Sequence, residues 1–298
     1  MKQALTEIRF LTRADAEEPV CAAIEAATGI APSFYSDAEK DFHFAAIYLH
    51  RRQNIPAMVE AIQERLAILR AEGIDIGTGS VALMKLKAED WAESWKRHFK
   101  PLRIGKALLI KPSWAKAKPA KGAKLVILDP GLSFGTGNHP TTQFCLNELV
   151  KARQLRAKQA FLDIGTGSGI LAIAAAKLGY APVEAFDFDP ACVRISKANA
   201  KSNRVDQHTT ITHKDLLTLK PAKRPEYSVI CANLIYDLLL QTDERLISRL
   251  KPGGTLILAG ILQTQFEKVR QHYQNAGLTL TATLVDREWQ SGAFSRPE

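Results

Sequence analysis

The chain has 298 residues, of which 46% are hydrophobic, and a formal net charge of +9. This length is enough for two domains with sizeable cores, since single domains cluster near about 100–150 residues. No run of about 18 apolar residues occurs, and four acidic side chains lie within residues 1–20, so we expect no membrane span, no signal peptide and a cytoplasmic location. The four cysteines lie far apart in the sequence, a spacing that indicates no zinc site or redox motif.

The charge is unevenly distributed along the chain. Residues 1–87 hold 10 basic and 12 acidic side chains, residues 88–124 hold 10 and 3, and the remaining residues hold 20 and 16. The middle segment therefore has an excess charge of +7. Such a segment could face RNA or an acidic protein surface, or form a solvated lysine-rich linker. The charge alone leaves these alternatives open.

Residues 1–87 have the pattern of a small α+β domain. Alternating hydrophobic residues predict strands, and helical spacing predicts two helices, the first of which ends at Gly29. The predicted order is strand, helix, strand, strand, helix, strand, over residues 4–11, 15–27, 31–36, 41–50, 55–72 and 80–86. This order is typical of a ferredoxin-like domain, in which two helices cover one face of an antiparallel sheet. His43 and His50 are isolated, so we interpret this half as a recognition domain.

Residues 88–124 are predicted to connect the two domains. Trp91, Trp95 and Phe99 are spaced four apart, which places them on one face of a helix that Pro101 ends. Residues 111–124 then supply five lysines together with prolines and a glycine, a composition typical of an exposed, mobile connection. The sequence thus predicts a connecting helix and a basic linker, with the second domain at residues 125–298.

The second domain opens with a short apolar strand at residues 125–128 and a glycine-containing loop at residues 129–142. Asn138 and Pro140 are good residues for starting a helix, which is predicted to run to Lys151. A helix start presents unpaired N–H groups to anionic ligands, so the carboxylate of a methionine moiety would fit here. An ordinary capped loop accounts for the same residues.

The central motif of the chain lies at residues 161–179. An apolar run ends at Asp163, Gly165, Gly167 and Gly169 follow at alternate positions, and an Ala- and Leu-rich segment comes next. This pattern predicts a strand, a tight turn and a helix, with glycines that let the backbone approach a nucleotide cofactor. Ile170 stands where a dinucleotide fingerprint requires its third glycine, which disfavours NAD. Asp-x-Gly-x-Gly-x-Gly resembles the first motif of class I methyltransferases that use S-adenosylmethionine (SAM), although such a turn also occurs without a ligand.

Two acidic residues follow at the ends of the next predicted strands. Asp187 ends the strand at residues 183–187, where a carboxylate can accept both ribose hydroxyls of a nucleotide. Asp189, before Pro190, is predicted to cap the helix at residues 191–203. Asp215 lies just past the strand at residues 209–212, where class I enzymes often contact adenine; a helix cap explains Asp215 equally well.

The strand at residues 227–233 delivers Asn233 to the carboxyl edge of the predicted sheet, where open α/β sheets bind ligands. Tyr236 keeps the spacing of the Asn-Pro-Pro-Tyr motif of amino-group methyltransferases, but both prolines are missing, and a core role for the tyrosine remains open. The rest of the pattern is a helix, a Lys-Pro-Gly-Gly turn, a strand, a helix and a final pair of strands, at residues 237–250, 251–254, 255–261, 266–275, 278–285 and 289–294. We therefore predict an α/β class I methyltransferase fold, a doubly wound sheet with a C-terminal antiparallel hairpin.

Together these segments resemble the ribosomal protein L11 methyltransferase family, PrmA. The resemblance rests on residues 91–105, the loop at 129–142 with its Phe-Gly-Thr-Gly-x-His-Pro-Thr-Thr, the turn and helix at 163–177, Asp187-Phe-Asp-Pro at 187–190, and Asn233. It implies SAM contacts at Thr142, Gly165, Asp187 and Asn233, and an N-terminal domain that recognises the ribosomal protein. Asn138 replaces the usual Thr of the loop, and either residue can cap a helix. Leu234-Ile235-Tyr236 replaces the usual Ile-Leu-Ala, so we expect an acceptor pocket of a different shape.

The resemblance implies that a lysine amine of ribosomal protein L11 attacks the SAM methyl group, with no general base required. Asn233, Tyr236 and His139 are candidates to orient the amine, and the chain is expected to act as a monomer without metal or membrane. Two alternatives remain at this point. One is a methyltransferase that acts on another protein or on RNA, to which the basic segment would lie close; the other is a non-catalytic SAM-binding module.

Overall fold

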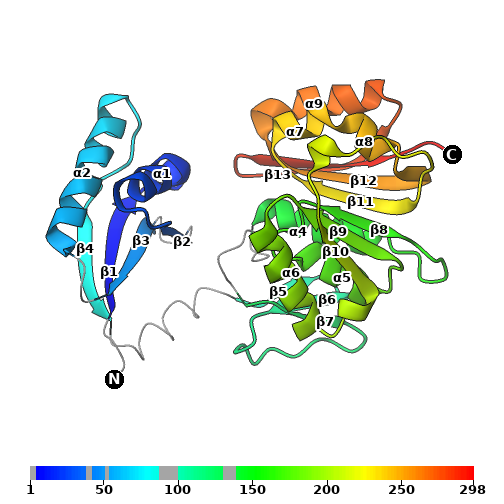
Figure 1. The fold of residues 1–298 in the computed structure, drawn as a ribbon, viewed down its shortest axis with the longest axis horizontal. Helices are drawn as coiled ribbons and strands as arrows, with labels where there is room; N and C mark the ends of the chain where they lie inside the picture. The colour runs from blue at the N-terminus through cyan, green and yellow to red at the C-terminus, as the bar shows by residue number, and fades with distance from the viewer. Residues whose placement is uncertain (1–4, 38–41, 51–53, 87–99, 130–138) are drawn as a thin grey trace. The chain divides into compact units, whose positions relative to one another are not determined.

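The computed structural model describes residues 5–37, 42–50, 54–86, 100–129 and 139–298 (Figure 1). The chain forms two compact units, Met1–His98 and Phe99–Glu298. In the described ranges, no helix is both long and apolar enough to cross a membrane. These ranges also contain no group of His, Cys, Asp and Glu side chains that could hold a metal ion. The helix predicted on Trp91, Trp95 and Phe99 lies outside the described residues.

The first unit has the element order predicted from its sequence. Its elements are β1 (Leu5–Thr12), a short 3-10 turn η1 (Ala14–Ala16), α1 (Glu17–Thr28), β2 (Ser33–Asp37), β3 (Phe42–His50), α2 (Ile55–Ala71) and β4 (Val81–Leu86). The four strands pair antiparallel in the order β2-β3-β1-β4. Gly29 ends α1 in a left-handed conformation, with its N–H on the carbonyl of Glu25.

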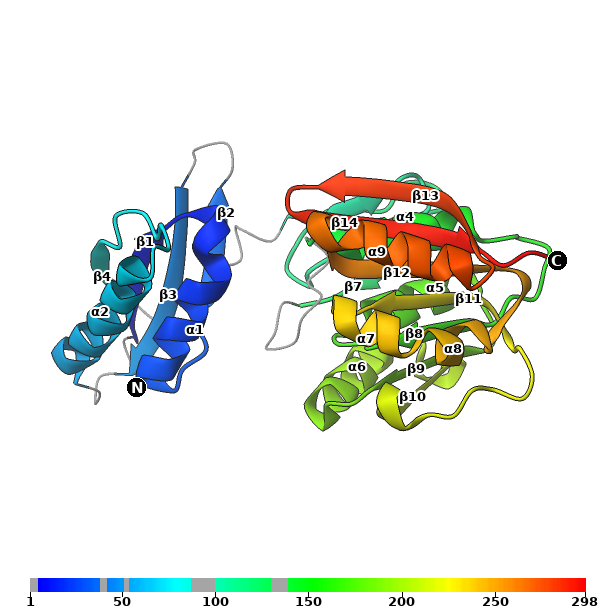
Figure 2. The ribbon, with the colours of Figure 1, turned by 90° about the horizontal axis from the view of Figure 1, so that it is seen from above.

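One face of this sheet carries the core of the first unit. Side chains alternate across a strand, so Ile8, Phe10 and Ile47 point to the same side. They are fully buried together with Ile24 of α1 and Ile62 of α2. Figure 2 shows the two helices side by side over the sheet. The alternation in the strands and the helical spacing thus meet in a single apolar layer.

The second unit begins with a three-stranded sheet, of which the sequence predicted only the strand at residues 125–128. Its strands are β5 (Leu102–Ile104), β6 (Leu108–Lys111) and β7 (Lys124–Ile127), with β5 antiparallel and β7 parallel to β6. Ile104, Leu108, Ile110 and Val126 are buried in the same core as α4 and α5 of this unit. Residues 102–110, which we expected to lie in the connection between the domains, thus contribute apolar side chains to this core. Most residues of the segment between β6 and β7 are exposed, as predicted, whereas Pro112 is buried.

The larger sheet has seven strands in the order β10-β9-β8-β11-β12-β14-β13. The strands are β8 (Phe161–Ile164), β9 (Val183–Asp187), β10 (Thr209–His213), β11 (Tyr227–Asn233), β12 (Leu250–Leu262), β13 (Thr279–Asp286) and β14 (Trp289–Ser295). The first five in this order are parallel, whereas β14 lies antiparallel between β12 and β13. This confirms the predicted doubly wound sheet with its C-terminal antiparallel hairpin.

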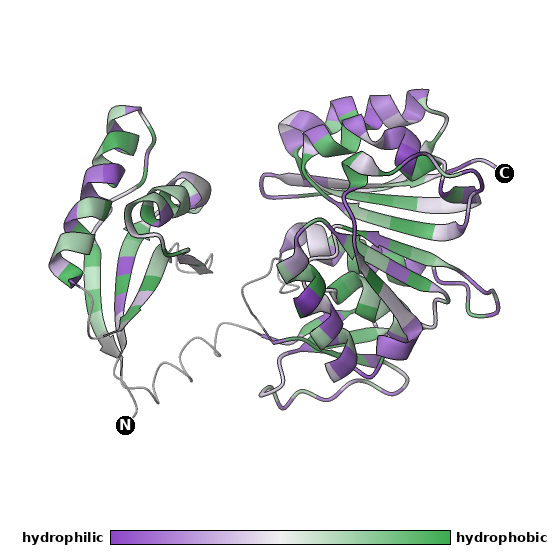
Figure 3. Ribbon diagram, in the orientation of Figure 1, coloured by the Kyte–Doolittle hydropathy of each residue, from purple (hydrophilic) through white to green (hydrophobic). Residues whose placement is uncertain are grey.

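Helices cover both faces of this sheet (Figure 1). On one side lie α4 (Pro140–Lys151), α5 (Ile170–Leu178) and α6 (Pro190–Ser202); on the other lie α7 (Tyr236–Gln241), α8 (Asp243–Ile247) and α9 (Gln263–Asn275). Successive residues of a strand enter different layers: Phe161 and Cys231 join the first core, Leu162 and Ile230 the second. Figure 3 shows apolar strands beneath the hydrophilic outer surface of α9.

Two details differ from the sequence prediction. The single helix predicted at residues 237–250 is broken at Thr242, whose hydroxyl donates to the carbonyl of Leu238 at 2.7 Å. Threonine hydroxyls that bond back to the preceding turn bend helices, which explains the break. The Lys-Pro-Gly-Gly segment lies within β12, yet Tyr227 pairs with Leu250 and Val229 with Thr255. Residues 251–254 therefore bulge out of the ladder, as a turn would.

Candidate cofactor and catalytic site

The glycine turn joins β8 to α5 at the carboxyl edge of the large sheet. Gly165, Gly167 and Gly169 all have positive φ angles, of 71°, 52° and 83°. This region strongly disfavours residues with a Cβ atom. A Cβ at Gly169 would also lie 2.9 Å from the Cβ of Ser196 in α6. The sequence prediction that this turn needs glycine is confirmed by its backbone.

Asp187 lies beside this turn at the end of β9. Its Oδ2 accepts from the Gly167 N–H at 2.8 Å, and its Oδ1 accepts from the Asp189 N–H at 3.0 Å. The side chain is only 5% exposed. A carboxylate oxygen can accept more than one hydrogen bond, so Asp187 can join the two loops and still receive donors from a ligand. Its contact with ribose hydroxyls remains a prediction.

Asp163, at the end of β8, is a buried acid of the site. Its Oδ2 accepts from the Thr166 hydroxyl at 2.7 Å and from the Ala172 N–H at 3.2 Å. Its Oδ1 is buried without a hydrogen-bond partner in the described part of the chain. Burial raises the pKa of Asp163 to about 7, against the lowering effect of these two donors. A cationic donor at Oδ1 would favour the ionised form.

The start of α4 forms the second wall of the site. Thr141 and Thr142 are each 1% exposed, and Thr142 Oγ1 is buried with no hydrogen-bond partner among the described residues. Pro140 occupies the first turn, as predicted, whereas Asn138 lies outside the described residues. Buried polar atoms in native proteins almost always have partners. The atoms of Thr142 and Asp163 that lack hydrogen-bond partners therefore fit a polar ligand. An amino-acid moiety matches them, because its ammonium group can donate to Asp163 and its carboxylate can accept from the Thr142 hydroxyl.

Asn233 ends β11 and contacts this wall through Thr141. The Asn233 Nδ2 donates to Thr141 Oγ1 at 3.2 Å, although 92 positions separate the two residues in the chain. Thr141 Oγ1 also lies 2.7 Å from Nδ1 of His139. Burial lowers the pKa of His139, which favours the neutral ring that can accept from the Thr141 hydroxyl. Gly260 leaves room for the Asn233 Oδ1, since a Cβ there would lie 3.1 Å from it.

Two other predicted residues have local structural roles. Asp215 is exposed and caps a 3-10 turn, η4 (Leu216–Thr218), by accepting from the Leu217 N–H at 2.9 Å. Tyr236 is half-buried at the start of α7 and packs against the core on that side of the sheet. The predicted cap at Asp189 is confirmed by its bond from the Ala191 N–H at 2.7 Å. Adenine contact by Asp215 and a catalytic role for Tyr236 stay predictions.

Sequence reasoning gave no role in the site to Thr141, Asp163 or Gly260. Asp163 follows an apolar strand and precedes the glycines, a position that predicts a buried carboxylate, so the sequence could have identified it as a site residue. No local signal marks Thr141 or Gly260, because their importance depends on contact with Asn233 from another strand.

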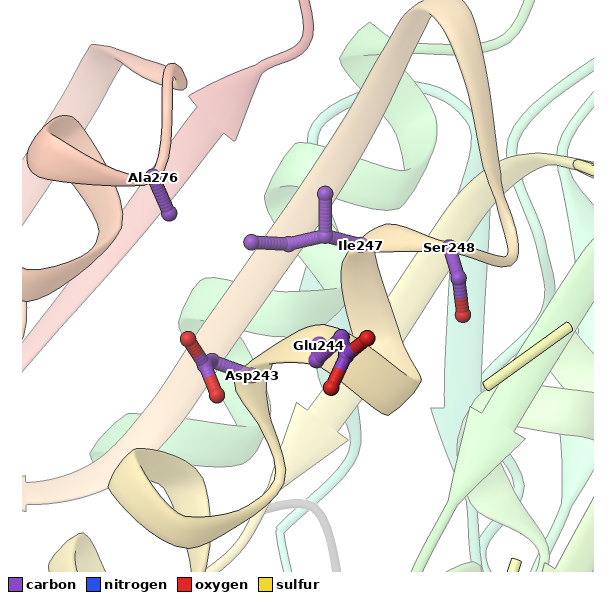
Figure 4. A pocket seen from close by; sticks show the side chains of 5 residues that line it. All are labelled: Asp243, Glu244, Ile247, Ser248 and Ala276. Carbon is purple, nitrogen blue, oxygen red and sulfur yellow. The ribbon is translucent and has the colours of Figure 1, made fainter. Parts of the chain in front are cut away.

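Two cavities of the described surface lie away from this edge. One, of about 300 Å³, is lined by Asp243, Glu244, Ile247, Ser248 and Ala276 (Figure 4). The other, of about 290 Å³, lies at the opposite edge of the large sheet and is lined in part by Glu184 and Tyr227. Neither contains a residue of the predicted site, so neither marks the place of the chemistry.

The fold and the site together define a class I SAM-dependent methyltransferase. The evidence is the strand order with its C-terminal hairpin, the left-handed glycine turn, Asp187 beside it, and the buried acceptors at the carboxyl edge. Ligands bind at that edge in doubly wound sheets.

Comparison with known proteins gives the family. The model of the family described as ribosomal protein L11 methyltransferase (PrmA) matches residues 4–296. A ribosomal protein L11 methyltransferase of Trichlorobacter lovleyi is 42% identical over 215 residues, 71% of this chain and 69% of the relative. One of Exiguobacterium sibiricum is 36% identical over 242 residues, 81% of this chain and 75% of the relative. The chain belongs to the ribosomal protein L11 methyltransferase family.

A solved structure agrees with this assignment. The crystal structure of the ribosomal protein L11 methylase of Lactobacillus delbrueckii subsp. bulgaricus has 30% sequence identity to this chain and a TM-score of 0.59. The match covers 67% of this chain and 100% of that one.

Proposed function

We propose that this protein transfers methyl groups from SAM to lysine amines of ribosomal protein L11. The observation that carries the proposal is the family match over residues 4–296, which includes both units of the chain. The names of the relatives support L11 as the acceptor. We assign recognition of this acceptor to the first unit, since the residues that we assign to the cofactor and to the amine all lie in the second unit.

The cofactor would be held at the carboxyl edge of the large sheet. Among the described residues, Asp163 Oδ1 is free to accept from the ammonium group of its amino-acid moiety and the Thr142 hydroxyl is free to donate to the carboxylate. Asp187 faces the glycine turn where its ribose would lie. Gly165, Gly167 and Gly169 keep the turn free of side chains. SAM, when bound, supplies a methyl group that its sulfonium already activates. The remaining requirement on the protein is to place a neutral amine in line with that group.

Asn233 is the residue that we assign to the amine. Its amide is oriented by the bond from Nδ2 to Thr141, which leaves Oδ1 as an acceptor for an amine N–H. A lysine with a pKa near 10.4 costs about 4–5 kcal/mol to present neutral at pH 7. Burial in an apolar cleft lowers that pKa and supplies part of this energy. Tyr236 is a second candidate for contact with the acceptor because it starts α7 three residues after Asn233.

The same assignment indicates the oligomeric state of the protein, its location and the form of its acceptor. We infer a monomer that acts in the cytoplasm on L11, either free or within the large ribosomal subunit. RNA is then a neighbour of the substrate, and the basic segment of the chain is the part suited to contact it.

Replacement of Asn233 by Ala tests the catalytic assignment. The variant is expected to transfer methyl groups to L11 at least about tenfold more slowly, as expected for the loss of an oriented hydrogen bond. Asn147→Ala is the matched control, since among the described residues this partly buried Asn of α4 bonds only the carbonyl of Gln143. Wild-type turnover of Asn233→Ala would refute the role of Asn233.

A further inference from the structure

The strongest charged feature outside the site is the basic strip, which we define as Arg103, Lys106, Lys116, Lys118, Lys121 and Lys124. These residues belong to the three-stranded sheet and to the segment between β6 and β7. All six are exposed. Residues 99–128 contain eight basic side chains and no acidic one. The strip is therefore a segment of the second unit with concentrated positive charge, in which Lys116, Lys118 and Lys121 share one exposed loop.

The positive charges of the strip are not neutralised by the fold. Among the described residues, none of the six forms an ion pair with a carboxylate. Asp129, the first acid after the strip, accepts the Ser113 N–H at 2.6 Å. Like charges kept close together repel one another, so such a surface gains stability when a polyanion neutralises it.

Hydrogen bonds and packing fix the backbone of the strip. The Lys124 N–H donates to the Ala107 carbonyl at 2.8 Å, and the Arg103 Nη2 donates to the Lys118 carbonyl at 3.2 Å. Beneath it, Leu108, Ile110 and Val126 are anchored in the core. A partner would therefore find the backbone of the strip already ordered, which reduces the entropy lost on binding.

The chemistry of the strip favours nucleic acid over an acidic protein. Five of its six residues are lysines, and lysine is depleted in protein interfaces, whereas lysines are common contacts of phosphates. The exposed large hydrophobic side chains of the described chain all lie outside residues 100–128. The strip therefore lacks the apolar anchors of a protein docking site.

We propose that the basic strip binds the phosphate backbone of RNA. The binding is independent of sequence, since lysines contact phosphates as point charges. The proposal rests on the proposed function in one respect: a ribosomal acceptor protein is presented beside RNA, so the strip would hold the enzyme at the place where that acceptor is bound.

The test compares two triple variants of the full chain with equal net charge. Lys116→Gln, Lys118→Gln and Lys121→Gln together remove three charges from the strip. Lys220→Gln, Lys223→Gln and Lys268→Gln remove three exposed charges elsewhere on the same unit. Fluorescence anisotropy with a labelled RNA hairpin, over a series of salt concentrations, gives the affinity and its salt dependence.

The strip variant is expected to lower the magnitude of the slope of log K against log salt by about 2–3, since each phosphate contact contributes about 0.9. The control variant should change the slope far less. Equal slopes for both variants, absence of salt-dependent RNA binding by the wild type, or equally tight binding of a labelled polyglutamate peptide would overturn the proposal. Methylation of free L11 without RNA should be the same in both variants, so this readout separates a failure of the proposed function from a failure of the RNA site.

Discussion

Substitution of Gly169 by Ala is expected to destabilise the second unit through two separable effects. Gly169 has a φ of 83°, and an Ala residue in the left-handed region costs roughly 1–2 kcal/mol. Its Cβ would lie 2.9 Å from Ser196 Cβ and 3.2 Å from Ser196 Cα, both fixed in α6. Overpacking against such a rigid neighbour costs about 1–3 kcal/mol more. The total expected loss in the free energy of unfolding is roughly 2–5 kcal/mol.

Gly277→Ala is the control that isolates the packing effect. Gly277 has a φ of 89° in the same unit, but a Cβ there would have no atom within 4 Å. Urea unfolding followed by tryptophan fluorescence includes the signal of the second unit through Trp114 and Trp289. Gly169→Ala should lose about 1–3 kcal/mol more than Gly277→Ala, and Ser196→Gly in the same chain should recover part of the difference. Equal losses in the two variants, or no recovery, would refute the reasoning.

Three further predictions concern the polar groups of the site. Asp163→Asn should weaken SAM binding about 10- to 150-fold in calorimetry, because a hydrogen bond to a charged group contributes about 1.5–3 kcal/mol; an unchanged affinity would show that Asp163 does not face the cofactor. The folded-state pKa of Asp163 is raised from 3.8 to about 7, so the cofactor-free wild type should lose thermal stability relative to Asp163→Asn as the pH rises from about 4 to about 7, and no further above that; a pH-independent difference would contradict the raised pKa. Thr141→Val should slow methyl transfer about 2- to 10-fold while SAM affinity stays the same, since it removes the single neutral hydrogen bond that orients Asn233; equal turnover would show that Asn233 is oriented by other contacts.

Most of the second unit could be predicted from sequence because its signals are local. The glycine turn, Asp187 and the cap at Asp189 each follow directly from residues a few positions apart. The alternation of apolar residues also gave the strands of the first unit and their order along the chain. Where one strand or helix is specified by its own pattern, the prediction needs no knowledge of its neighbours.

The parts that could not be predicted depend on contacts between distant segments. β5 and β6 are only three and four residues long, and their lysine-rich surroundings concealed apolar residues that are buried against α4 and α5. Thr141 gains its role only because the sheet order brings Asn233 to the start of α4. The break at Thr242 reflects one side-chain bond that competes with the helix. Tertiary context decides such features, and helical spacing alone does not reveal them.

The most direct test of the account is intact-mass analysis of unmethylated ribosomal proteins after incubation with this protein and SAM. The account predicts mass increases of whole methyl groups on L11 alone, which form at least about tenfold more slowly with the Asn233→Ala variant under the same conditions. Methyl groups on another ribosomal protein or on RNA, or no transfer to any ribosomal component, would contradict it.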